Sequence, residues 1–258
     1  MSDWLELDDA ARRVYGGLHQ LLFRFAGRVP DEWLTHTRGM LGGGDLNYLP
    51  DTISGSMLEL GLPLRAAEAE LLRYTLVALG VEGDPPAGLH LVRISEEPTP
   101  PTDHRFYPAP PEVLVSAGER IPPSLDLTGG DPLALSDLPA DLAHLDDLAL
   151  DLTDRQDDAA LGNVYGRQDV IALWRAWRFG PDGPPGGGHR IYLAEVAPDT
   201  QSSRVTYELQ RALVRRGEEN PQVEVFWTGE ELAPYHRAAL AGAARLWVRP
   251  DSVRGAEV

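Results

Sequence analysis

The stretch Ile191-Tyr192-Leu193-Ala194-Glu195-Val196 is the first of three short apolar runs between Arg190 and Arg249. The other two are Val223-Glu224-Val225-Phe226-Trp227 and Leu246-Trp247-Val248. Helical patterns lie between them, from Arg204 to Arg216 and from Pro234 to Ala244. Strands that alternate with helices of this length are typical of βαβ units with parallel pairing. This part of the chain therefore predicts an α/β domain.

A β-hairpin is predicted directly before this stretch. The apolar run from Val170 to Phe179 is followed by a loop rich in glycine and proline, residues 180–188, which returns the chain to Arg190. Two strands joined by such a loop are typical of an antiparallel hairpin.

Further upstream, an additional strand and helix are predicted. Leucines alternate with polar residues from Leu148 to Leu152, and Thr153 or Asp154 can cap a short helix that follows. From Leu148 the order is β-α-β-β-α-β, followed by one extra helix and strand. The first six elements match the ferredoxin-like arrangement. This is a match of topology alone, and a fold does not imply a function.

Residues 1–84 predict a helical domain. Apolar residues recur at helical spacing in the first helix, at Trp4, Leu7, Ala11, Val14, Leu18, Leu21 and Phe25. Gly16-Gly17 interrupt this helix, which predicts a partner surface that approaches closely there. Three more helical patterns follow, near residues 31–41, 51–60 and 66–79. We therefore expect a small helical bundle.

Residues 85–140 predict an irregular connecting segment that is rich in proline and acidic. Twelve of the 22 prolines lie between Asp84 and Pro139. Proline lacks a backbone donor and restricts the residue before it, so a continuous sheet or helix is excluded. Two short strands are still expected, at Leu89–Ile94 and Val113–Val115. The domains expected are thus residues 1–84, 85–140 and 141–258, in a chain of the α+β class.

Two absent residue types exclude several kinds of chemistry. The chain has no cysteine, which removes thiol nucleophiles, disulfides and thiolate metal sites. It has no lysine either, since all 23 basic residues are arginine, which excludes a Walker A lysine and a Schiff-base lysine. No apolar run approaches the ~20 residues that span a membrane, and no signal-peptide pattern opens the chain. We therefore expect a cytoplasmic protein.

The net charge of −17 is concentrated in the middle of the chain. Residues 86–160 hold 15 acidic residues and 4 arginines, a net charge of −11, whereas residues 161–258 hold 12 of each. Such a chain repels phosphate backbones and anionic membranes, so neither nucleic acid nor a membrane is an expected partner. A protein with a basic surface is compatible with this charge.

Six aspartates are crowded into thirteen residues of this acidic region, at Asp146, Asp147, Asp151, Asp154, Asp157 and Asp158. Carboxylates of this kind can hold magnesium or calcium. The run lacks the glycine and terminal glutamate of an EF-hand loop, however. A solvated acidic face is the favoured interpretation, and neither a metal site nor a cofactor is predicted.

A group of basic and aromatic residues is the first candidate ligand site; its members are Trp174, Arg175, Trp177, Arg178 and Arg190. Arginine forks and aromatic rings could bind an acidic ligand or stack on a base. In the competing interpretation, the aromatic side chains pack on the sheet and the arginines pair with the acidic residues before them.

The carboxyl ends of the two parallel strands are the second candidate site. Asp199 follows the first strand, and the second is followed by Thr228, Glu230, Glu231, Tyr235 and His236. A histidine near glutamates and a tyrosine could act in general acid–base catalysis. Thr228 and Glu231 also fit a helix capping box, although Pro234 suggests that the helix begins later.

Two functions are compatible with these patterns. The first is a protein-interaction protein, an inhibitor or immunity-type protein or an accessory subunit, whose acidic surface binds a basic partner. The alternative is an enzyme or small-ligand-binding protein that uses the crevice at the carboxyl ends of the C-terminal strands.

Overall fold

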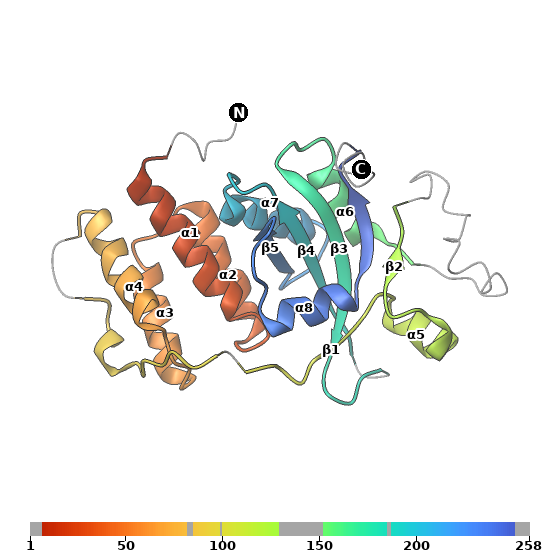
Figure 1. Cartoon of the computed structure of the whole chain (residues 1–258), viewed down its shortest axis with the longest axis horizontal. Helices are drawn as coiled ribbons and strands as arrows, with labels where there is room; N and C mark the ends of the chain where they lie inside the picture. The colour runs from red at the N-terminus through yellow and green to blue at the C-terminus, as the bar shows by residue number, and fades with distance from the viewer. Residues whose placement is uncertain (1–6, 82–84, 99, 129–151, 185–186, 251–258) are drawn as a thin grey trace. The chain divides into compact units, whose positions relative to one another are not determined.

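The computed structural model describes residues 7–81, 85–98, 100–128, 152–184 and 187–250. Within these ranges the chain contains eight α-helices and a six-stranded mixed sheet (Figure 1). It divides into two compact units, Met1–Pro100 with Asp199–Gln210, and Pro101–Pro198 with Arg211–Val258. The predicted α+β class is confirmed. The domain boundaries at residues 84 and 140 stay predictions.

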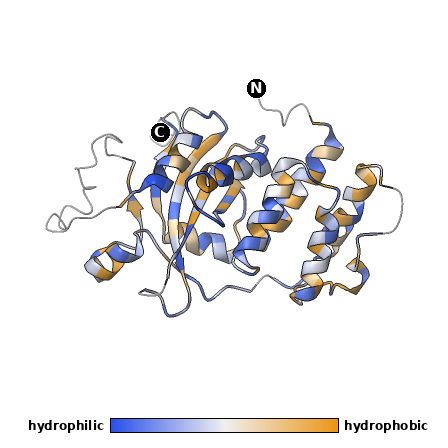
Figure 2. Ribbon diagram, turned by 180° about the vertical axis from the view of Figure 1, so that it is seen from behind, coloured by the Kyte–Doolittle hydropathy of each residue, from blue (hydrophilic) through white to orange (hydrophobic). Residues whose placement is uncertain are grey.

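The first unit contains the helices predicted near the N-terminus: α1 (Asp9–Arg24), α2 (Asp31–Gly43), α3 (Leu49–Glu59) and α4 (Ala66–Ala78). α1 begins at Asp8, whose side chain accepts a hydrogen bond from the amide of Ala11 at 2.7 Å. The apolar stripe of α1 is buried at Val14, Leu18 and Leu21. The same helices carry polar residues on their other faces (Figure 2). The description of this part as a bundle stays a prediction.

Glycines allow close packing at two places in this unit. A Cβ atom at Gly17 would lie 2.7 Å from Cδ2 of Leu71 in α4, which confirms the predicted close approach. A Cβ at Gly42 in α2 would lie 2.8 Å from the carbonyl oxygen of Ser203 and closer still to Cβ of Tyr207, both in α7 (Ser202–Val214). At Gly42 the contact requires glycine, because backbone and Cβ atoms block an added methyl group, whereas at Gly17 the blocking atoms are the end of the flexible Leu71 side chain.

The prediction of two strands at Leu89–Ile94 and Val113–Val115 in the proline-rich region is wrong. Leu89–Leu91 form a short 3₁₀ helix, η2, and residues 113–115 belong to α5 (Pro111–Ala117), which leads into a second 3₁₀ helix, η3 (Gly118–Arg120). Proline is favoured in the first turn of a helix, so Pro111 starts α5 despite the strand-forming valines that follow. In the described part of this region, the strands are β1 (Arg105–Tyr107) and β2 (Leu125–Asp126).

The remaining strands are β3 (Val170–Phe179), β4 (His189–Val196), β5 (Gln222–Trp227) and β6 (Ala244–Val248), and the sheet order is β2-β6-β3-β4-β5, with β1 also paired to β3. β3 and β4 form the predicted antiparallel hairpin, and β4 and β5 are parallel as predicted. The first strand of the ferredoxin-like arrangement, Leu148–Leu152, lies almost wholly outside the described residues. That arrangement stays a prediction.

Pairing between strands assigns side chains to two faces of the sheet, because directly paired residues point the same way. Arg175 pairs with Tyr192 and Trp177 with Arg190, so these four residues share one face. That face contacts α6 (Arg155–Val164) through Asp157, whose carboxylate forms an ion pair with Arg175. The other face carries Trp174, Arg178 and Glu224, and α8 (Pro234–Ala241) contacts it through Tyr235 and His236.

Two glycines of the same helix provide a test of this packing. We expect Gly42→Ala to lower the free energy of unfolding by roughly 1–3 kcal/mol, because backbone and Cβ atoms of α7 block the added methyl group. Gly39→Ala in α2 meets no atom within 4 Å and should raise it by roughly 0.5–1 kcal/mol. Urea unfolding followed by circular dichroism measures both, and equal effects would contradict the close packing at Gly42.

Candidate functional site

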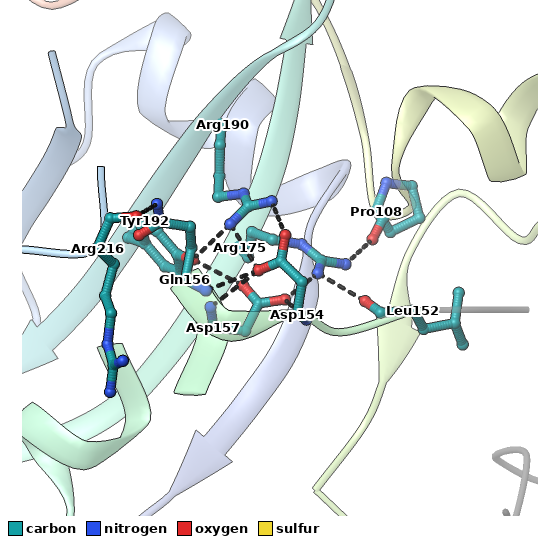
Figure 3. A network of polar contacts seen from close by, with 9 residues as sticks. All are labelled: Pro108, Leu152, Asp154, Gln156, Asp157, Arg175, Arg190, Tyr192 and Arg216. Atoms are coloured by element: carbon teal, nitrogen blue, oxygen red, sulfur yellow. Dashed lines mark hydrogen bonds and ion pairs between the residues drawn. The ribbon is translucent and has the colours of Figure 1, made fainter. Parts of the chain in front are cut away.

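A buried polar network joins α6 to the hairpin of β3 and β4 (Figure 3). Asp157 and Arg175 are both 0% exposed and form an ion pair. The Asp157 carboxylate also accepts a hydrogen bond of 2.7 Å from the hydroxyl of Tyr192. Arg175 donates further to the carbonyl oxygens of Leu152 at 2.6 Å and Pro108 at 2.8 Å. One arginine therefore holds together α6, the segment before it and the segment after β1.

Asp154 extends this network to the N-terminus of α6. Its carboxylate accepts hydrogen bonds from the amides of Gln156 at 2.8 Å and Asp157 at 3.2 Å, which confirms the predicted cap. The same carboxylate binds both terminal nitrogens of Arg190. The guanidinium carbon of Arg190 lies 4.6 Å from the centre of the Trp177 ring, in a cation–π contact.

The network shifts the pKa values of Tyr192, Asp154 and Arg190. Burial, and then the charge of Asp157, raise the pKa of Tyr192 well above its usual value, so the phenol stays protonated. Burial raises the pKa of Asp154, but hydrogen bonds and charge from Arg190 outweigh it and lower the pKa overall. Burial lowers the pKa of Arg190, and its bond to Asp154 with the nearby charges raises it above the usual value. The network thus fixes charges in the fold.

A second polar group lies on the opposite face of the sheet. Nε2 of His236, in α8, is 3.1 Å from a carboxylate oxygen of Glu224, in β5, and the two side chains are 1% and 0% exposed. The hydroxyl of the neighbouring Tyr235 accepts a hydrogen bond of 3.2 Å from Arg178 of β3. The Tyr235 ring also contacts Phe106 edge-on.

The predicted basic-aromatic group is divided between the two faces. Arg175, Trp177 and Arg190 lie with α6, whereas Trp174 and Arg178 lie with α8. Trp174 stacks on Phe226 with ring centres 6.2 Å apart. Arg175 and Arg190 bind Asp157 and Asp154 of the acidic region. The contacts of Trp174, Arg175 and Arg190 are of the kind that the competing interpretation describes, and ligand binding by this group stays a prediction.

The residues predicted at the carboxyl ends of the strands have separate roles. Thr228 donates its amide, at 2.9 Å, and its hydroxyl, at 3.2 Å, to the carbonyl oxygen of Val196. Glu230 accepts a hydrogen bond of 3.0 Å from the amide of Trp227, and Glu231 is exposed.

Two further placements complete this set of predicted residues. α8 begins at Pro234, so the capping box expected from Thr228 to Glu231 does not start a helix. Asp199 is exposed in the turn before α7 and belongs to the first unit.

Three buried residues of these groups were not identified from the sequence. Tyr192 and Glu224 were not proposed as site residues, and Asp157 was not singled out as the partner of a particular arginine. Two signals could have identified them. Glu224 is a charged residue inside an apolar strand, which requires a buried partner. Tyr192 is two residues from Arg190 in a strand, so the two side chains share a face.

The acidic run is only partly described. Asp146, Asp147 and Asp151 lie outside the described residues, Asp154 and Asp157 are in the network, and Asp158 is exposed. Within the described ranges, no three histidine or carboxylate side chains are grouped closely enough to bind a metal ion. No helix in those same ranges has the length and apolar character needed to cross a membrane.

Adjacent aspartates of α6 test the energetic importance of the network. Asp157→Asn should lower the free energy of unfolding by about 3–5 kcal/mol, because Arg175 would remain buried without a counter-charge. The matched control Asp158→Asn changes an exposed side chain and should stay within roughly 0.5 kcal/mol of the wild type. Chemical denaturation measures both, and equal losses would contradict a central role for Asp157.

The protonated phenol of Tyr192 should make the protein less stable in alkali. An unfolded tyrosine ionises near pH ~10, whereas the folded one keeps its proton, so above that pH the unfolded chain binds fewer protons and stability falls as pH rises.

We expect Tyr192→Phe to flatten this alkaline decline, measured by urea unfolding between pH 8 and 11. Tyr165→Phe, at a residue that is 78% exposed, should leave the decline unchanged. Identical pH profiles for the wild type and Tyr192→Phe would contradict the raised pKa.

Comparison of the chain with protein-family models, with curated proteins and with solved structures finds no match in any of the three.

Proposed function

We propose that this chain is a cytoplasmic protein-interaction protein whose acidic region binds a basic surface on a partner protein. An inhibitor, an immunity-type protein or an accessory subunit would act in this way. The observation that carries the proposal is the charge of −11 in residues 86–160, beside a C-terminal part whose charges balance.

Within the described residues, three carboxylates of this region pair with arginines of the C-terminal part. Asp126, Asp154 and Asp157 bind Arg245, Arg190 and Arg175 respectively, each arginine coming from residues 161–258. These three ion pairs offset three of the negative charges of the region. Other carboxylates of the region are exposed in the second unit, namely Asp103, Glu112 and Asp158.

Residues 129–151 are the most acidic part of the region in composition, with six aspartates and no arginine. A complementary basic surface would attract this segment, speed association and select against acidic competitors. Nucleic acids and anionic membranes are negatively charged, so this segment would repel them. A basic protein is therefore the partner that we propose.

The alternative, an enzyme or small-ligand-binding protein that uses the crevice at the carboxyl ends of the C-terminal strands, has less support. His236, its expected acid–base residue, is 1% exposed and already contacts Glu224. Glu230 accepts a backbone hydrogen bond in the turn after β5.

Charge-neutralising variants test the proposed function. The quadruple variant Asp141→Asn, Asp146→Asn, Asp147→Asn and Asp151→Asn should lose a stoichiometric basic partner in affinity purification from the native host. Its affinity for that partner should fall roughly tenfold or more, because the loss of complementary charge weakens association. Binding of the wild type should also weaken as salt is raised.

A control variant carries the same charge change at exposed residues of the described part of the chain: Glu32→Gln, Glu59→Gln, Glu219→Gln and Glu231→Gln. It should retain the partner. The proposal fails if the wild type recovers no stoichiometric partner, or if both quadruple variants bind the partner equally well.

A further inference from the structure

We draw no further inference here: the strongest candidate, the surface patch of exposed apolar side chains at Leu58, Leu60 and Leu91 where η2 packs beside the C-terminal end of α3, is an unpartnered apolar face, and nothing in the described part of the chain shows what covers it.

Discussion

The ion pair between Asp157 and Arg175 is the interaction on which the C-terminal part of the fold depends. Both side chains are completely buried, so each requires the other to avoid an unpaired charge in a medium of low dielectric constant. Tyr192, opposite Arg175 on the neighbouring strand, also donates a hydrogen bond to the Asp157 carboxylate. The position of α6 and the register of the β3–β4 hairpin are therefore coupled, because a shift of one strand by one residue would move its donor to the other face of the sheet.

The same network links the acidic region to the balanced C-terminal part. Asp154 and Asp157 lie near the C-terminal end of the acidic region. Each forms an ion pair with an arginine, Arg190 of β4 and Arg175 of β3 respectively. The pairing neutralises two carboxylates where the acidic segment leads into α6, a helix that buries Asp157, Ala160 and Val164. The negative charge of the region is the basis of the partner that we propose, whereas the His236 and Glu224 side chains near α8 are buried and in contact with each other.

The order of elements was predictable because it rests on local patterns. Alternation of apolar runs with helical spacing identified β4, α7, β5, α8 and β6, and a loop of glycine and proline identified the hairpin. The candidate ligand site was less predictable, because neighbours along a strand point to opposite faces. Arg175 and Arg178 accordingly bind Asp157 and Tyr235 on opposite sides of the sheet. The strand predicted at Val113–Val115 was wrong for another reason. Pro110 and Pro111 were interpreted as interrupting structure, but proline can also begin a helix.

The sequence by itself determined the absence of lysine and cysteine chemistry, the concentration of negative charge and the succession of strands and helices. These properties depend on composition or on periods of a few residues. Only the tertiary structure decided which charges are paired. Arg175 donates to Pro108, 67 residues away, and to Asp157, while Glu224 meets His236 across a strand and a helix. Such contacts depend on strand register and on the face that each helix covers, which are long-range consequences of packing.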